Sequence, residues 1–245
     1  MDIDVKELKQ SLRERIWKEL EEKGIAVFPR PVYGRIPNFK SAEKAAIRLF
    51  SLDIWNKAKT VKVNPDSPQK YIRYRALAEG KKVLMPTPKL REGFLLLDPA
   101  RIPRSEYNYA STIRGAFKYG IKVPIARIPK VDLIITGSVV VDFYGNRIGK
   151  GGGYGDLEYG ILRELGKISA DTPVITTVHD VQVLSEELPH EEHDIVLDII
   201  ITPTRLIQTK RKREKPKGII WELITEDMIE KIPILKDLKR ILKVD

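Results

Sequence analysis

The sequence predicts an α/β protein built on an open, largely parallel sheet with helices on both faces. Apolar runs of strand length recur from about residue 83 onward, and segments with helical spacing separate them. Strands buried on both faces have this continuous apolar character, whereas strands with one wet face alternate. With 245 residues, of which 42% are hydrophobic, the chain can also bury a substantial core.

The first third of the chain is expected to be helical apart from one strand. Apolar residues recur at steps of three and four from Val5 to Leu20, which gives a helix one apolar face, and Gly24 is a stop signal. The segment Thr60–Val63 alternates as a strand does. The elements expected here are helices over 4–23 and 41–56, a strand over 60–63, a loop over 64–68 and a helix that then runs to Gly80.

From residue 83 the pattern becomes strand, turn and helix. Strands are expected where the apolar runs lie, and Pro203 stops the last of them. We see no repeat of 20–50 residues and no linker that divides the chain. We therefore expect one domain over residues 1–245, with residues 1–60 as a helical extension packed on it. The expected strands are 83–86, 94–97, 133–136, 139–141, 174–178 and 199–202, and the expected helices are 157–166 and 226–242.

Composition excludes several classes of protein. The absence of Cys rules out a disulfide scaffold, a thiolate nucleophile and a zinc site with sulfur ligands. The acidic start over residues 1–6 is unlike a signal peptide, and no apolar run approaches the roughly 18 residues of a membrane span. We therefore expect a soluble, cytoplasmic protein that makes no membrane contact.

The positive charge of the chain is concentrated in one loop. Lys and Arg number 44 against 34 Asp and Glu, which gives a net charge of +10. The run 210–217 holds six basic residues and one acidic residue, so half of the net charge lies there. Such a run is ordinarily a solvated loop, and the alternative is weak, non-specific contact with RNA or another anion. No aromatic residue interleaves the run, so base stacking is not predicted.

The most informative segment is the glycine loop, residues 142–156, which contains six glycines. It follows an apolar strand and precedes a helix, and ligands bind at the carboxyl ends of strands in open α/β sheets. Glycines let the backbone approach a phosphate, and a helix N-terminus presents free N–H groups. Arg147 and Lys150 add positive charge, and Asp156 is suited to hold Mg²⁺.

Two well-known phosphate loops do not fit the segment. A Walker loop fails because Gly145 and Gly149 are one residue too close, and a dinucleotide fingerprint starting at Gly149 would need Gly at Tyr154. A flexible surface loop is the alternative, and the charged residues within this loop favour phosphate binding over it.

The loop resembles the signature of the 5-formyltetrahydrofolate cyclo-ligase (methenyltetrahydrofolate synthetase) family, Asp-x-x-Gly-x-Arg-Leu-Gly-x-Gly-x-Gly-Tyr-Tyr-Asp. Residues 9–13 are similar to the family's N-terminal Lys-x-x-Leu-Arg helix, and residues 188–204 to its second block. The resemblance spans nearly the whole chain. Segments 28–31, 35–40, 86–91 and 232–235 resemble the subgroup of methenyltetrahydrofolate synthase domain-containing proteins.

The resemblance implies a cyclo-ligase fold, a reaction and a set of residues. ATP would phosphorylate the formyl oxygen of 5-formyltetrahydrofolate or a related formyl-pterin, and ring closure would give the 5,10-methenyl form, ADP and phosphate. Arg147 is implied as the catalytic residue, and Asp156 with Asp194 as the Mg²⁺ ligands. The implied ATP-binding residues are Lys9, Arg13, Arg147, Gly149, Lys150, Gly151, Gly152, Gly153, Tyr154 and Gly155.

The substrate side departs from the family pattern. Gly155 replaces the family's second Tyr, and Lys150 stands where an aromatic residue or Arg is common. The family's folate-binding Glu has no clear counterpart, and Asp66 is the nearest candidate. His179 ends an apolar strand and is a second candidate, against a plain hydrogen-bonded strand end. His193 and Asp194 could equally form an exposed turn.

Three functions therefore remain open from the sequence. The first is an ATP- and Mg²⁺-dependent cyclo-ligase that acts on a reduced formyl-folate or a related pterin. The second is a non-catalytic nucleotide-binding or RNA-associated protein on the same fold, and the third is an ATP-dependent ligase with another substrate. An acidic residue placed to read a pterin favours the first, and a continuous basic stripe from 210–217 to the glycine loop favours the second.

Overall fold

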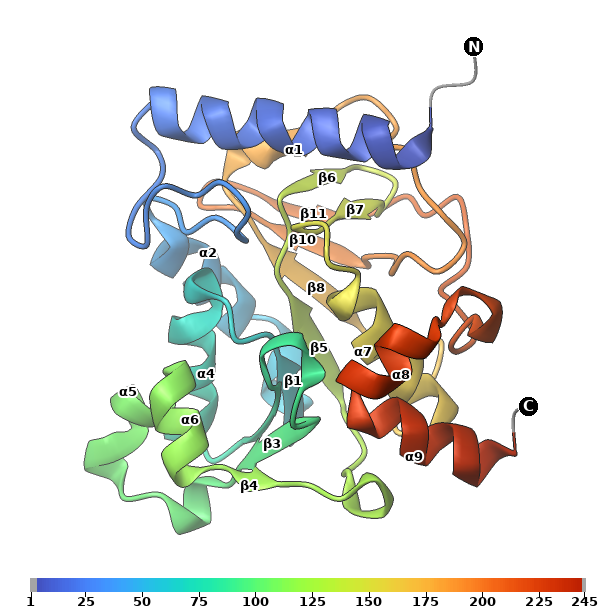
Figure 1. The fold of residues 1–245 in the computed structure, drawn as a ribbon. Coiled ribbons are helices and arrows are strands. Elements are labelled where there is room, and N and C mark those ends of the chain that lie inside the picture. The colour runs from blue at the N-terminus through green and yellow to red at the C-terminus, as the bar shows by residue number, and fades with distance from the viewer. Residues whose placement is uncertain (1–3, 244–245) are drawn as a thin grey trace.

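A computed structural model describes residues 4–243 of the chain. Its centre is an eight-stranded, mainly parallel sheet with helices against both faces, and a three-stranded sheet lies above it in Figure 1. This arrangement confirms the predicted fold class. The strands of the large sheet, in their spatial order, are β11 (Leu206–Gln208), β10 (Ile199–Ile201), β8 (Val174–Thr177), β5 (Leu133–Thr136), β1 (Thr60–Val63), β2 (Lys82–Pro86), β3 (Phe94–Leu97) and β4 (Ile121–Lys122).

The central strands of the large sheet are parallel and the strands near its edges are antiparallel. β1 pairs in parallel with β2 and β5, and β8 pairs in parallel with β5 and β10. β3, β4 and β11 run antiparallel to their neighbours. The central strands are buried on both sides, as parallel strands between helices must be, which explains why apolar runs located them.

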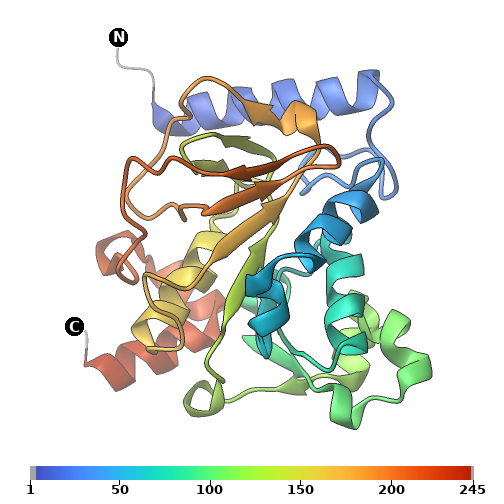
Figure 2. The same cartoon turned by 180° about the vertical axis from the view of Figure 1, so that it is seen from behind.

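Helices cover both faces of this sheet, as the views from the front and from behind show (Figures 1 and 2). Val61 and Val63 of β1 pack with the helices of one face, and Ile134 and Val174 of neighbouring strands pack with those of the other. The first face carries α2 (Ala42–Phe50), α3 (Asp53–Lys57), α4 (Lys70–Ala78), α5 (Tyr107–Ala110) and α6 (Ile113–Tyr119), and the second carries α7 (Tyr154–Glu164), α8 (Glu226–Lys231) and α9 (Pro233–Leu242).

The connections of the sheet create a crevice between β1 and β5. From β1 the chain crosses through α4 to β2 on one side, and from β5 it crosses through α7 to β8 on the other side. Adjacent parallel strands whose connections leave in opposite directions open a crevice at their carboxyl ends. The residues at this point are the loop that begins at Asn64, after β1, and Gly137, after β5.

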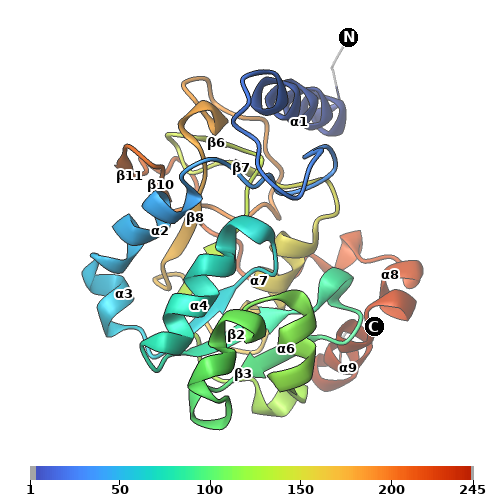
Figure 3. The ribbon, with the colours of Figure 1, turned by 90° about the vertical axis from the view of Figure 1, so that its left-hand side faces the viewer.

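The small sheet holds the start of the glycine loop and lies beneath α1 (Val5–Glu22). Ile16 and Leu20 of that helix pack with Val140 and Ile148 of the sheet, and α1 is seen nearly end-on above it in Figure 3. The run predicted as a strand over 139–141 therefore does not belong to the large sheet. Its strands are β6 (Val140–Asp142), β7 (Arg147–Ile148) and β9 (Val183–Leu184), in the order β7, β6, β9.

Two predicted helices are each divided in the structure. The helix predicted over 41–56 breaks after Phe50, because the Ser51 hydroxyl bonds the Arg48 carbonyl and ends the helical pattern. The helix predicted over 226–242 breaks before Pro233, because proline lacks an N–H and drives the preceding residue out of the helical region. The segment between β3 and β5 holds α5, α6 and β4, which no pattern in the sequence predicts.

Among residues 4–243, no helix is both long and apolar enough to cross a bilayer. The expected boundary at residue 60 stays a prediction, as does the expectation of one domain over residues 1–245, whose first three and last two residues lie outside the described range.

Candidate active site

A cavity of about 460 Å³ lies over the crevice at the carboxyl end of the large sheet. Its walls come from five parts of the chain that are distant in sequence. The lining residues are Pro29 and Gly34 to Ile36 from the N-terminal loop, Asn64 to Ser67 after β1, Thr87 to Lys89 after β2 together with Ile113, and Arg147, Gly149, Lys150, Gly152 to Asp156 and Glu158 from the glycine loop and α7.

The glycine loop begins as a tight hairpin between β6 and β7. The buried Asp142 carboxylate accepts hydrogen bonds from the backbone N–H groups of Tyr144, Asn146 and Leu188 and from the Asn146 amide. Gly145 has a φ of +85°, and a Cβ there would lie 2.5 Å from the Leu197 carbonyl oxygen. Asp142 therefore holds the turn that aims the rest of the loop, as a side chain at a strand end often does.

Arg147 enters the cavity from β7 with part of its guanidinium uncommitted. Its Nε donates to the Gly137 carbonyl at 2.9 Å and its Nη1 donates to Asp156 at 3.0 Å. Nη2 has no hydrogen-bond partner among residues 4–243. A Cβ added to Gly149 or to Gly155 would lie 2.9 Å from Nη2, so only glycines at these two positions leave the guanidinium its space. The free edge is a donor for an anion.

Asp156 lies in the first turn of α7, where a carboxylate suits the partial positive charge of the helix N-terminus. Its Oδ1 accepts from Arg147 and from the backbone N–H of Ile195 at 3.0 Å. Its Oδ2 has no hydrogen-bond partner in the described part of the chain. One oxygen is thus structural and the other is available to a cation.

The first helix, α1, contributes Lys9 and Arg13 from beyond the glycine loop. Arg13 Nε donates to the Gly149 carbonyl at 2.7 Å, which ties the helix to the loop. Lys9 is 5% exposed, and its ammonium lies 2.7 Å from Glu191 and 2.6 Å from Asp194. Neither basic residue lines the cavity, although Arg13 is close enough to the cavity residues Arg147 and Asp156 for their charges to act on its pKa.

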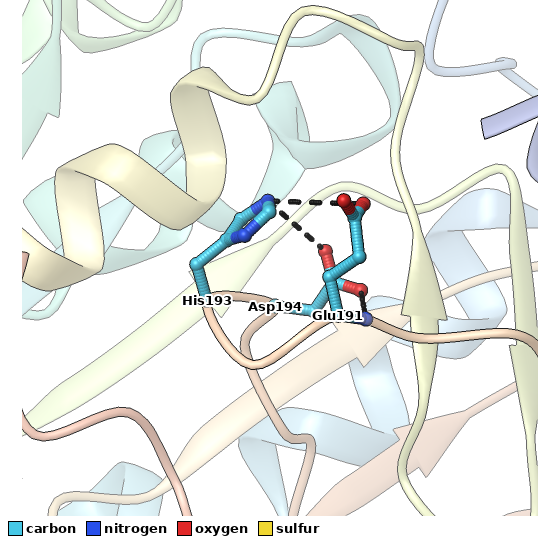
Figure 4. Close-up of side chains that lie close together, drawn as sticks. All are labelled: Glu191, His193 and Asp194. Carbon is cyan, nitrogen blue, oxygen red and sulfur yellow. Dashed lines mark hydrogen bonds and ion pairs between the residues drawn. The ribbon is translucent and has the colours of Figure 1, made fainter. Parts of the chain in front are cut away.

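Glu191, His193 and Asp194 gather on the segment before β10 (Figure 4). His193 Nε2 lies 4.0 Å from Glu191 and 3.8 Å from Asp194. Asp194 is 5% exposed, so this is not the exposed turn that the sequence left open. Glu191 is a member that sequence reasoning missed. Lys9 already neutralises much of the negative charge of the two carboxylates.

Asp66 and Lys150 face each other across the cavity mouth. The Lys150 ammonium lies 3.1 Å from Asp66, so the basic residue of the loop is paired with the acidic candidate for the substrate. The loop of Asp66 is held by Arg73, which is fully buried and donates to the backbone carbonyls of Asn64, Asp66 and Ser111. Burial lowers the pKa of Arg73 to about 10, so its guanidinium remains charged at neutral pH.

A buried ion pair beside the cavity escaped sequence reasoning altogether. Lys62 of β1 lies 2.5 Å from Glu158 of α7 and donates to Asn64 at 2.6 Å. We call Lys62 and Glu158 the buried pair. Lys62 lies between Val61 and Val63, and alternation along the strand turns it toward α7. A lysine inside a central strand was the signal, because a charge buried there requires a partner.

His179 does not come to the cavity. It caps the short helix η6 (Asp180–Gln182): its Nδ1 accepts from the Val181 N–H, and its own N–H donates to Gln182. Its ring lies 6.0 Å from that of Phe39. Burial lowers the pKa of His179, which favours the neutral ring. The geometry supports the plain strand-end reading of His179, and not the substrate role that was expected.

Most of the basic run 210–217 is paired within the protein. Arg211 lies 3.4 Å and Lys215 2.5 Å from Asp198. Lys212 pairs with Glu187 at 2.5 Å and lies over the Tyr144 ring. Arg213 donates to Asn146 and to the Asp194 carbonyl, which fastens the run to the glycine hairpin. The run therefore contacts the glycine loop through bonds within the protein. Contact with RNA stays a prediction.

The chain is similar in sequence to known proteins. Over 234 residues the chain is 44% identical to the methenyltetrahydrofolate synthase domain-containing protein of Mus musculus, an alignment that covers 94% of this chain and 63% of that protein. Over 89 residues it is 34% identical to the 5-formyltetrahydrofolate cyclo-ligase of Mycolicibacterium smegmatis, covering 36% of this chain and 42% of that enzyme.

A solved structure shares the fold. The NMR structure of 5,10-methenyltetrahydrofolate synthetase from Aquifex aeolicus matches with a TM-score of 0.54 and 22% sequence identity, over 84% of this chain and 95% of that one. The chain spans less than two thirds of the length of the mouse relative. A model of the 5-formyltetrahydrofolate cyclo-ligase family matches residues 5–203. The chain therefore belongs to the 5-formyltetrahydrofolate cyclo-ligase family.

Proposed function

We propose that this protein is an ATP- and Mg²⁺-dependent cyclo-ligase that converts 5-formyltetrahydrofolate, or a related formyl-pterin, to its 5,10-methenyl form with release of ADP and phosphate. The observation that carries the proposal is the free Nη2 edge of Arg147, enclosed by Gly149 and Gly155 beside the cavity. Phosphoryl transfer depends on positioning and charge neutralisation more than on covalent chemistry, and a guanidinium in a cradle of backbone supplies both.

The residues around the glycine loop fit a nucleoside triphosphate. ATP supplies the phosphoryl group that makes the formyl oxygen a leaving group. Arg147 has N–H groups to donate to that phosphoryl, and Arg13 packs beside Gly151, with its guanidinium 3.7 Å from where a Cβ would lie. Lys9 would contribute charge from the far side of the loop. The glycines Gly149, Gly151, Gly152, Gly153 and Gly155, with Lys150 and Tyr154, would form the cradle.

The donor set also fits Mg²⁺, which binds through one or two carboxylates together with substrate phosphates. Asp156 has an oxygen without a hydrogen bond, and the Oδ1 of Asp194 accepts none among residues 4–243. Ile195 follows Asp194 directly in the chain, and its backbone N–H donates to Asp156, so one residue links the two carboxylates. Lys9 would then share Asp194 with the metal ion, and the ion would neutralise part of the negative charge that Lys9 now neutralises.

The cavity fits the second substrate. Its volume of about 460 Å³ lies within the range of small-molecule sites. Carboxylates lie at its mouth and beside its floor, in Asp66 and Glu158. A continuous free basic stripe would favour an RNA-associated protein. Four of the six cations of the run 210–217 have internal partners, so the support for that alternative is weaker.

The test is to mix the protein with MgATP and 5-formyltetrahydrofolate and to follow the absorbance of the methenyl product. We expect product that requires both ATP and Mg²⁺, and no product from the Arg147→Ala variant at matched folding stability. ATP binding in calorimetry without methenyl product from any formyl-pterin would overturn the cyclo-ligase and favour the nucleotide-binding alternative.

A further inference from the structure

We infer that Glu158, held by Lys62 and Asn64, is the carboxylate that recognises the amino-pyrimidinone edge of the substrate and so sets which heterocycle the cavity accepts. This inference rests on the proposed function, because it assigns a residue to the heterocycle of that substrate. Neither the glycine loop nor the family signature includes the buried pair, and the phosphate chemistry does not use it.

The geometry leaves one oxygen of Glu158 for a ligand. The residue is 4% exposed, and its side chain lines the cavity. Oε2 lies 2.5 Å from the Lys62 ammonium, and Oε1 has no hydrogen-bond partner among residues 4–243. Lys62 is 1% exposed and also donates to Asn64, the first residue of the loop that Arg73 holds. Lys62, which does not line the cavity, therefore fixes the orientation of the Glu158 carboxylate.

A buried carboxylate with a free oxygen requires donors from the ligand. Burial raises the pKa of Glu158, and the Lys62 ammonium beside it opposes that shift. Hydrogen bonds from an N–H group to a carboxylate are stronger than those between neutral groups. The 2-amino group of a pterin, beside a ring N–H on a flat ring, presents such a donor to the free Oε1.

The other two carboxylates of the cavity are less suited to this task. Asp66 is committed to Lys150 at the mouth, where the lysine side chain is 46% exposed to solvent. Asp156 is committed to Arg147 and to the Ile195 N–H on the phosphate side. Glu158 alone among the three combines near-complete burial with a partner that approaches from outside the cavity.

The inference predicts a discrimination that can be measured without turnover. Pterin has an amino group at position 2, and lumazine has a carbonyl oxygen there. We expect the parent protein to bind pterin about tenfold or more tightly than lumazine in a fluorescence titration, since hydrogen bonds to charged groups are worth that factor. In Glu158→Gln the order should invert, because the amide oxygen stays with Lys62 and the amide N–H group donates to the carbonyl oxygen of lumazine but meets the donor amino group of pterin. Asp66→Asn should keep the parent preference.

A second variant guards against misfolding. Glu158→Gln leaves Lys62 buried without its anion, and a buried charge that loses its partner destabilises a protein. Lys62→Met with Glu158→Gln removes both charges, and it should melt near the parent temperature and show the same loss of pterin preference. Unchanged preference in both variants, or a preference moved by Asp66→Asn instead, would overturn the inference.

The outcomes also separate this inference from the proposed function. Methenyl product from the parent protein, with pterin preference independent of Glu158, would overturn the inference and leave the cyclo-ligase in place. Pterin preference that depends on Glu158, without product, would overturn the cyclo-ligase and support the recognition role. Binding of neither ring by the folded parent protein would overturn the inference.

Discussion

The glycine loop and the buried pair form two sides of one cavity, and they are built in opposite ways. The loop is a continuous stretch of chain whose glycines make room for Arg147 and leave its Nη2 edge free. The buried pair joins residues 96 positions apart, and its charges neutralise each other. One side offers uncommitted donors to an anion, and the other offers a single oriented acceptor. The two sides therefore suit two different substrates.

This difference decides what the sequence could predict. The loop carries its spacing and charge in neighbouring residues, so its phosphate chemistry could be proposed from the sequence, along with Arg147 and Asp156. Asp194 was implied only by the family resemblance. The pairing of Lys62 with Glu158 depends on β1 and α7 meeting in space, and no local pattern encodes that contact. Glu191 was missed for the same reason, since only the docking of α1 brings Lys9 to it.

The elements of the fold also divide into those that a local sequence pattern predicts and those that it does not. Central strands were predicted because burial on both faces leaves a continuous apolar run. The small sheet was missed because β7 and β9 have two residues each, too few to show a period. His179 was a candidate for the substrate, against a plain strand end, because it ends an apolar strand. Its capping bonds with Val181 and Gln182 could not be predicted from that position.

The largest effect is expected from Arg147→Lys, which attacks the free donor edge of the loop. An ammonium cannot bond Gly137 and Asp156 as the guanidinium does and still present a fixed free donor, so turnover should fall on the order of 100-fold, about 3 kcal/mol, while ATP binding changes much less. The check is turnover at saturating ATP beside the ATP dissociation constant. A dissociation constant that rises by the full factor, with turnover unchanged, would make Arg147 a binding residue only.

Gly155→Ala tests the space around Arg147. The added Cβ would lie 2.9 Å from Nη2 and displace the guanidinium, so we expect turnover to fall roughly tenfold, because small displacements in an active site are costly. Stability should hold, since Gly155 lies in the first turn of α7 and alanine is a better helix former than glycine. Gly166→Ala is the control: it strains the backbone at a φ of +61°, meets no atom within 4 Å and does not line the cavity. An equal loss of turnover in the control, at equal stability, would argue against displacement.

Asp142→Asn and Asp156→Asn should separate structure from metal binding. Asp142 accepts from three backbone N–H groups, and an amide nitrogen would face some of these donors, so unfolding should become easier by about 1–3 kcal/mol. Asp156→Asn should instead weaken Mg²⁺-dependent nucleotide binding. Denaturant unfolding and calorimetry with MgATP measure the two effects. Equal losses of nucleotide binding in the two variants, at equal stability, would contradict the assignment.

Lys9→Met asks whether Mg²⁺ can take the place of the ammonium. Removing Lys9 leaves Asp194 buried without its cation, which should lower stability by roughly 2 kcal/mol, less than for a fully buried pair because Glu191 stays partly exposed. Added Mg²⁺ should then raise the melting temperature of the variant more than that of the parent. An identical Mg²⁺ response in the two proteins would remove Asp194 from the metal site.

The smallest effect concerns the basic run 210–217. Among residues 4–243, the side chains of Lys210 and Lys217 are those of the run without an ion-pair or hydrogen-bond partner. The logarithm of any affinity for single-stranded RNA should therefore fall with the logarithm of salt concentration with a slope of about −1.4. Six free cations would give about −4. A filter-binding titration over salt concentration distinguishes the two, and the steeper slope, or selectivity for sequence, would revive the RNA-associated alternative.

The central claim is that the two sides of the cavity bring a formyl oxygen to the phosphoryl group that Arg147 holds. If the formyl oxygen is phosphorylated and then leaves as the ring closes, that oxygen must depart within the released phosphate. The direct measurement is a reaction with ¹⁸O in the formyl group of 5-formyltetrahydrofolate, followed by mass analysis of the phosphate. One ¹⁸O atom per phosphate, in step with methenyl formation, is the expected result. Unlabelled phosphate would contradict the account.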